Sequence, residues 1–214
     1  AGGYLIRTGE AFQKTFLNAG GYFLELDTRA DPHYDANGLG RVHKSGCSPF
    51  VCLSVPFSAA PLYTVEDANP GPMSLCCYAS TEDGVLCGAD EQAAYTLLDS
   101  RETLACVSAT FACALDAATV ITQRYTVSGH GVCISLHGGK SVGFMLPVFD
   151  FDGTDSTCIT RSEGTIAVKY DGCVCRYTFD GTVSDAYSLY CNRNGRYRVY
   201  RMQGRELRIT IERI

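Results

Sequence analysis

Short segments in the second half of the chain alternate apolar and polar residues, and turn dipeptides separate them. The pairs Asp171-Gly172, Asn194-Gly195 and Gln203-Gly204 stand between such segments. Two-residue turns with these residues accept positive φ and match the twist of an antiparallel hairpin. Because strand side chains point alternately to two faces, a period of two indicates strands with one buried face. These features predict a chain of antiparallel hairpins with little helix.

The same alternation, bounded by glycine or asparagine, is found along the whole chain. Strands are expected at Tyr4–Thr8, Ala11–Leu17, Tyr22–Asp27, Phe50–Val55, Ser74–Ser80, Val85–Gly88, Tyr95–Ser100, Thr103–Ala114, Thr119–Val127, Val132–Leu136, Val142–Pro147, Cys158–Arg161, Thr165–Tyr170, Cys173–Phe179, Tyr187–Cys191, Arg196–Met202 and Arg205–Glu212. So many short strands exceed a small immunoglobulin-like sandwich. We predict an all-β fold, a large antiparallel β-sandwich of two stacked sheets.

A chain of 214 residues can enclose one large β domain or two small ones. A local break at Asp116-Ala117-Ala118 would divide it into two units, but no Pro/Ser-rich linker marks that position. We therefore predict a single domain over residues 1–214. The chain begins at Ala1 without an initiator Met or a signal stretch, so we expect it to be excised from a larger protein.

The charge and the motifs limit the possible partners. A net charge of −5 argues against a general nucleic-acid binder, and no window approaches the roughly 20 apolar residues of a membrane helix. No phosphate-binding loop, dinucleotide fingerprint or G-x-S-x-G elbow is present, so no cofactor is expected. The segment from Asp150 to Asp155 resembles half of a calcium loop, but we read it as a turn and expect no metal.

Twelve cysteines are spread along the chain. Most have apolar neighbours typical of buried strand positions, as at Cys76-Cys77, Cys106, Cys133 and Cys173-x-Cys175, and free cysteine behaves as a small hydrophobic residue. We expect mostly reduced core thiols, with some disulfides as the alternative. Reduced cysteines favour a cytoplasmic location, although the sequence leaves the compartment unknown.

The segment from Thr28 to Pro49 is read as a long polar connection. Loops of this length in compact domains tend to be functional. His33, Tyr34 and His43 combine imidazoles and a phenol with nearby carboxylates, which are the groups of general acid–base chemistry, and Arg41 and Lys44 are candidates for binding a substrate. The alternative is a solvated loop whose polar residues cap turns.

The C-terminal hairpin is locally basic. Seven arginines lie between Asn192 and Ile214 against only two glutamates. Since arginine binds carboxylates and sulfates through two parallel hydrogen bonds, Arg196 and Arg198 are candidates for holding an acidic sugar. A solvated strand face is the alternative.

Several segments together resemble the β-sandwich region of heparinase II/III-like proteins. They read GGYFLELDT at 20–28, HYD at 33–35, GLGRVHK at 38–44, and the run from GVCIS at 131–135 to LPVFD at 146–150. The resemblance implies a polysaccharide-lyase context in which a helical α/α toroid and a sandwich together cleave uronic-acid-containing glycans by β-elimination. It implies that His33 serves as acid and base, with Tyr34 or His43 as a further candidate for these roles. The partners would be an acidic polysaccharide and a neighbouring α-helical domain.

The toroid that supplies the rest of such a site is absent from this sequence, so the chain is not expected to act as an enzyme alone. We expect a sandwich domain that supports the missing catalytic domain. One alternative is a carbohydrate-binding module with Tyr34, Tyr63 and Tyr197 as a sugar platform. Another is a self-contained polysaccharide lyase.

Overall fold

The computed structural model describes residues 2–9, 13–31, 33–55, 57–58 and 70–214, and strands dominate this part of the chain. Its first sheet, here the N-terminal sheet, has the order β1-β2-β3-β4-β5. Its strands are β1 (Tyr4–Arg7), β2 (Lys14–Ala19), β3 (Tyr22–Asp27), β4 (Gly38–Lys44) and β5 (Leu53–Ser54). All the neighbours pair antiparallel.

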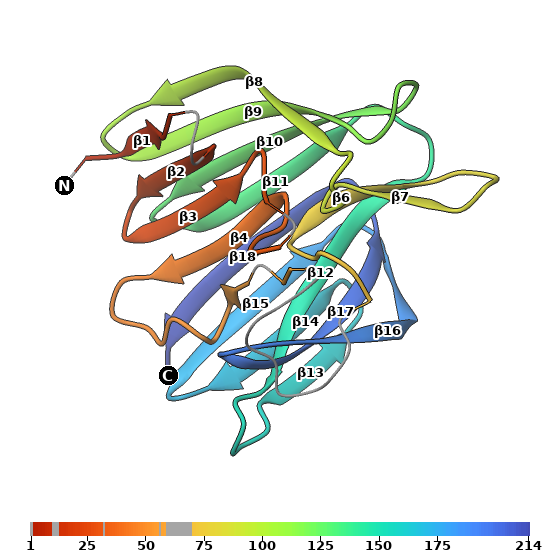
Figure 1. Ribbon diagram of the computed structural model, residues 1–214. Helices are drawn as coiled ribbons and strands as arrows, with labels where there is room; N and C mark the ends of the chain where they lie inside the picture. The colour runs from red at the N-terminus through yellow and green to blue at the C-terminus, as the bar shows by residue number, and fades with distance from the viewer. Residues whose placement is uncertain (1, 10–12, 32, 56, 59–69) are drawn as a thin grey trace.

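The largest sheet, here the eight-stranded sheet, has the order β13-β14-β15-β18-β11-β10-β9-β8. Its strands are β8 (Ala94–Glu102), β9 (Cys106–Ala114), β10 (Val120–Ser128), β11 (Gly131–His137), β13 (Cys158–Ser162), β14 (Thr165–Tyr170), β15 (Cys173–Phe179) and β18 (Glu206–Arg213). The last strand of the chain therefore lies at the middle of the sheet, between β11 and β15 (Figure 1).

The third sheet, here the β12 sheet, has the order β16-β17-β12-β6-β7. Its strands are β6 (Cys76–Ser80), β7 (Val85–Cys87), β12 (Val142–Phe151), β16 (Thr182–Asn192) and β17 (Gly195–Gln203). A backbone bridge between Leu39 and Leu75 joins the start of β4 to the residue before β6. The N-terminal sheet and the β12 sheet are thus linked through the starts of β4 and β6.

These two linked sheets cover the same face of the eight-stranded sheet. On β10 the side chains of Ile121, Gln123, Tyr125 and Val127 are buried, in strict alternation along the strand. Gln123 donates a hydrogen bond to Cys77 of β6, while β2 of the N-terminal sheet packs on β9 and β10. The molecule is therefore a two-layer sandwich with one continuous apolar core.

The predicted all-β antiparallel sandwich is confirmed. The expectation of two sheets needs correction, because the second layer is divided into two sheets that meet at the Leu39–Leu75 bridge. The break at Asp116 is a hairpin turn between β9 and β10. The Asp116 carboxylate accepts hydrogen bonds from the N–H groups of Ala118 and Thr119 at 2.8 and 2.6 Å.

The reading of Thr28 to Pro49 as one long connection is wrong, because it contains β4, an inner strand of the N-terminal sheet. Two glycines, three polar side chains and a register shift opposite Glu25 and Leu26 hide the alternation of this strand. Gly38 has a φ of 105°, and a Cβ there would lie 2.5 Å from Ser74 Oγ. Only glycine fits this entry into β4 without strain.

The expectation that Cys133 is a core position is wrong, since it is exposed on the outer face of β11. Cys76, Cys77, Cys173 and Cys175 are buried as expected. Tyr197 is fully buried against Phe57 and Phe149, so it cannot form part of a sugar platform. Tyr63, the other proposed platform residue besides Tyr34, lies outside the described residues.

Candidate functional site

Three surfaces carry the chemistry that the sequence suggests or that the fold creates. The first is the connection between β3 and β4. The rings of His33 and Tyr34 meet edge to face with their centroids 4.5 Å apart, and both side chains are exposed. The Asp31 carboxylate accepts a hydrogen bond from the His33 N–H at 3.0 Å, and the Asp31 carbonyl accepts one from the Tyr34 N–H at 2.9 Å. This part of the connection is a tight turn that presents the His33–Tyr34 pair to solvent.

A cluster of ion pairs ties this turn to the outer face of the N-terminal sheet. Lys14 Nζ lies 2.8 Å from Glu25, 3.0 Å from Asp35 and 3.3 Å from Asp27. Arg41 Nε lies 3.0 Å from the other oxygen of Glu25. Burial lowers the pKa of Lys14, but the hydrogen bonds and charges of Glu25 and Asp35 outweigh it and raise the pKa above its ordinary value. Lys14 therefore stays charged and holds three carboxylates together.

His43 lies on the same outer face as Arg41. Its ring centroid is 6.2 Å from that of Phe23, and its Nε2 is buried with no hydrogen-bond partner in the part of the chain that the structure describes. Burial, and next the charge of Arg41, lower the pKa of His43. An imidazole held neutral in this way can accept a proton only at reduced pH.

Lys44 leaves the opposite face of β4, because consecutive strand residues alternate. Its Nζ lies 4.1 Å from the centroid of the Tyr22 ring and donates a hydrogen bond to the Gly20 carbonyl at 2.7 Å. The structure thus joins Arg41 to the turn of His33 and Tyr34 through the Lys14 cluster, but it does not bring Lys44 to Arg41.

The second surface is built around Asp150 of β12. Arg196 Nε donates to one carboxylate oxygen at 2.8 Å, and Arg198 Nε donates to the other at 2.7 Å. Asp150 is buried, and a buried carboxylate is strongly destabilising unless it is paired. Arg198 also lines a cavity of about 440 Å³ together with Arg161, Tyr200, Ser156 and Thr157. The two predicted sugar-binding arginines therefore hold Asp150 in a different sheet from Arg41.

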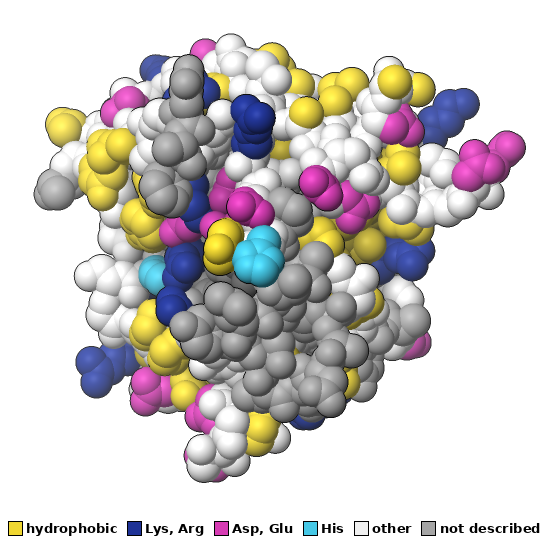
Figure 2. Space-filling view, viewed as in Figure 1, with side chains coloured by type: hydrophobic (Ala, Val, Ile, Leu, Met, Phe, Trp, Pro, Cys, Tyr) yellow, Lys and Arg dark blue, Asp and Glu magenta, His cyan; other side chains and the backbone are white. Residues whose placement is uncertain are grey.

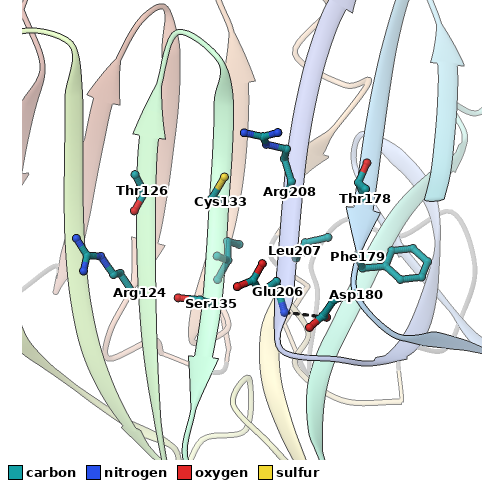
Figure 3. A pocket seen from close by; sticks show the side chains of 11 residues that line it. Arg124, Thr126, Cys133, Ser135, Thr178, Phe179, Asp180, Glu206, Leu207 and Arg208 are labelled. Carbon is teal, nitrogen blue, oxygen red and sulfur yellow. Dashed lines mark hydrogen bonds between the residues drawn. The ribbon is translucent and has the colours of Figure 1, made fainter. Parts of the chain in front are cut away.

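The third surface is a groove on the outer face of the eight-stranded sheet, with a volume of about 510 Å³ (Figure 3). The registers of β10, β11, β18 and β15 align its side chains in two rows. One row is Thr126, Cys133, Arg208 and Thr178, and the other begins with Arg124, Ser135 and Glu206. Because side chains of aligned residues point to the same face, the two rows present polar and charged groups together, and Phe179 adds an apolar ring to the groove.

Asp180 closes the second row of the groove. Its carboxylate accepts hydrogen bonds from the N–H groups of Arg205 and Glu206, each at 2.9 Å, and is fixed by them. Within the described ranges no ion pair is found for Arg124, Arg208 or Glu206, whose side chains are exposed. These groups are available to a ligand.

Sequence reasoning did not find this groove. Arg208 and Glu206 belong to the basic hairpin that it singled out, but Arg124 and Ser135 lie in other strands. The place of Arg124 in an alternating strand, between the buried Gln123 and Tyr125, was a usable signal. The pairing of β11 with β18 could not be predicted in this way, because the paired residues are 71 or more positions apart in the sequence.

Comparison with known proteins adds no assignment, since no family model and no curated protein matches the chain. Among the described residues no group of three or more His, Cys, Asp or Glu side chains is arranged to hold a metal ion. A search of the same residues finds no helix with the length and hydrophobicity needed to cross a membrane.

Proposed function

We propose that the chain is a carbohydrate-binding β-sandwich domain that holds an acidic oligosaccharide in the groove of the eight-stranded sheet. The observation that carries this proposal is the pair of aligned polar rows, with two exposed arginines that have no ion-pair partner in the described part of the chain. Such a surface offers a sugar both hydrogen bonds and, at Phe179, an apolar ring.

The dimensions of the groove suit a short oligosaccharide. Neighbouring strands of a sheet lie about 4.8 Å apart, so a row over four strands spans roughly 14 Å. Arg124 and Glu206 are two strands apart and thus separated by about 10 Å. A ligand of a few sugar rings would contact both.

The side chains supply complementary chemistry. The guanidinium groups of Arg124 and Arg208 bind a carboxylate or sulfate through paired, charge-assisted hydrogen bonds. The Glu206 carboxylate accepts hydrogen bonds from sugar hydroxyls. The hydroxyls of Ser135 and Thr178 can donate hydrogen bonds to sugar oxygens and can also accept them from sugar hydroxyls. An acidic glycan therefore fits better than a neutral one.

Affinity measurements with groove variants test this proposal. The purified chain is titrated with uronate-containing and sulfated oligosaccharides and with neutral oligosaccharides of equal length. Arg124→Ala and Arg208→Ala are each expected to weaken binding of the acidic ligand by about tenfold or more, the cost of one charge-assisted hydrogen bond. The matched control is Arg176→Ala, since Arg176 lies on the same face but pairs with Glu212 outside the groove. Equal affinity in all three variants would contradict the proposal.

A second candidate is the support of a helical catalytic domain, as the heparinase II/III-like resemblance implies. The observation in its favour is an apolar row on the outer face of the N-terminal sheet. Ile6 is 52% exposed and lies opposite Phe16 in the register of β1 and β2, and the Phe16 ring stacks on Phe23 with centroids 5.8 Å apart. Figure 2 shows hydrophobic side chains mixed with charged ones over β1 to β4.

This second candidate predicts a complex that sedimentation can detect when the chain is mixed with an α/α-toroid catalytic domain of the heparinase II/III type. Ile6→Lys would abolish that complex, since it places a charge in the centre of the contact. The same variant leaves glycan binding in the groove unchanged, so the two candidates are separable.

A further inference from the structure

Eight of the twelve cysteines form four pairs of adjacent thiols. Cys76 Sγ lies 3.5 Å from Cys87 Sγ in the interior of the β12 sheet. Three more pairs of thiols lie close enough for one thiol to shift the pKa of the other, namely Cys77 with Cys113, Cys47 with Cys173, and Cys52 with Cys175. Core cysteines that serve only as small hydrophobic residues have no reason to be placed two by two.

The alternation of β6 explains the first two pairs. Cys76 and Cys77 are consecutive, so their side chains leave opposite faces of the strand. Cys76 lies next to Cys87 of the neighbouring strand β7. In the register of these two strands, Cys87 is opposite Tyr78 of β6. Cys77 points into the other layer, where it meets Cys113 of β9 and accepts a hydrogen bond from Gln123 Nε2 at 3.2 Å. One strand is thereby joined both to its own sheet and to the opposite layer.

The other two pairs connect the segment around β5 to β15. Cys173 and Cys175 are two residues apart and therefore lie on the same inner face of β15. The Ser48 N–H donates a hydrogen bond to Cys173 Sγ at 3.3 Å, and the Tyr177 hydroxyl donates one to Cys52 Sγ at 3.4 Å. These contacts hold Cys47 and Cys52 opposite their partners, although Ser48 and Cys173 are 125 positions apart in the sequence.

We propose that these four pairs are disulfide sites, Cys47–Cys173, Cys52–Cys175, Cys76–Cys87 and Cys77–Cys113, and that the chain folds in an oxidising compartment. Each bond forms by thiol–disulfide exchange with a small disulfide such as glutathione disulfide. Two thiols of the protein lose two protons and two electrons as their S–S bond forms, and the oxidant's S–S bond is reduced to two thiols. This proposal departs from the cytoplasmic location that reduced cysteines favour.

Burial determines when these bonds form. The thiolate is the form that attacks a disulfide, and burial raises the pKa of the Cys76 thiol well above its ordinary value. Most of the eight thiols are shielded from solvent in the folded chain, so an added oxidant reaches them slowly. Exchange therefore takes place while the chain folds, and the finished bonds resist reduction until the chain unfolds.

Two exposed cysteines provide an internal control. Cys133 and Cys158 lie on the surface, and neither has a thiol contact in the described ranges. They are the most accessible thiols, so random oxidation would modify or link them first. If oxidation forms only the four core disulfides, Cys133 and Cys158 both stay free thiols.

The experiment is refolding of the full, reduced chain in a buffer of glutathione and glutathione disulfide, followed by alkylation in denaturant and peptide mapping without reduction. The expected result is the four named disulfides, alkylated Cys133 and Cys158, and a thermal midpoint that falls when dithiothreitol is present. All twelve cysteines alkylated, or disulfides with another connectivity, would overturn the proposal.

Variants keep the test decisive if one bond is needed for folding. Cys76→Ala with Cys87→Ala removes a single bond, and the other three bonds are expected to map unchanged. Cys133→Ser is the matched control and leaves all four bonds and the thermal midpoint unchanged. Appearance of a new bond to Cys158 in the double variant would contradict the assigned pairing.

Discussion

The Tyr22 hydroxyl of β3 accepts a hydrogen bond from the Ile211 N–H of β18 at 2.9 Å and donates one to the Ile211 carbonyl at 3.3 Å. The pairing of β11 with β18 extends only to Val132 and Ile209, so the backbone groups of Ile211 on that side have no strand partner. One phenol from the opposite layer satisfies both groups. This contact fixes the N-terminal sheet over the middle of the eight-stranded sheet.

Tyr22→Phe is therefore expected to destabilise the fold by about 1–3 kcal/mol, because two buried backbone groups lose their partner. Urea unfolding monitored by circular dichroism measures this change. Tyr4→Phe is the control, since Tyr4 is 38% exposed and its hydroxyl makes no hydrogen bond to a described residue. Equal stability of the two variants would show that Tyr22 does not join the layers.

Asp150 is expected to stabilise the β12 sheet rather than to bind a ligand. Asp150→Asn removes the charge that Arg196 and Arg198 share and should cost about 2–4 kcal/mol, since two partly buried cations lose their ion pair with this carboxylate. Asp185→Asn breaks the Arg161–Asp185 pair, in which the Asp185 side chain is 95% exposed, and should cost less than about 1 kcal/mol. Denaturant unfolding of both variants checks the difference, and a reversed order would contradict this role.

The lowered pKa of His43 predicts an acid-sensitive fold. Its neutral form is favoured when folded, so the unfolded chain binds the proton more readily. The stability that His43 contributes is present above its unfolded pKa of about 6.5 and is lost as the pH falls through that value. The free energy of unfolding should therefore drop between pH 7.5 and 5.5 by more in the wild type than in His43→Gln. His130→Gln, in an exposed turn, should behave like the wild type.

The chain is expected to release no unsaturated uronate from acidic polysaccharides. Ultraviolet absorbance of the reaction mixture measures this release. His33 and Tyr34 are exposed, and Arg41 is already paired with Glu25, so among the described residues no arranged group acidifies a substrate proton next to them. Absorbance that grows with the wild type and vanishes with His33→Ala would establish a self-contained lyase instead. Arg29→Ala, in the same connection, is the control for nonspecific effects.

Local patterns predicted the strands well, and long-range pairing limited the rest. Alternation and turn pairs identified β14, β15, β17 and β18 within a few residues of their observed bounds. The division of the second layer into two sheets depends on the contact between Leu39 and Leu75, which no local pattern encodes. The strand β4 was missed because its two glycines and its bulge break the period of two.

The candidate site shows the same limit. Sequence reasoning left open whether His33 and Tyr34 form a site or a solvated turn, and it grouped Arg196 and Arg198 as sugar ligands without the buried Asp150 that pairs with both. The groove residues Arg124 and Arg208 come together only because β11 pairs with both β10 and β18 in the sheet. Neighbouring strands that are distant in sequence cannot be assigned from one sequence alone.

The most direct test of the central claim is the change in backbone amide NMR shifts when a uronate-containing oligosaccharide is added to the labelled chain. Binding in the groove predicts that the shifts concentrate on the outer rows of β10, β11, β18 and β15, around Arg124, Ser135 and Arg208, and that Arg208→Ala makes them smaller at the same ligand concentration. Shifts confined to the His33 turn or to the N-terminal sheet would contradict the claim and place the ligand on the other layer.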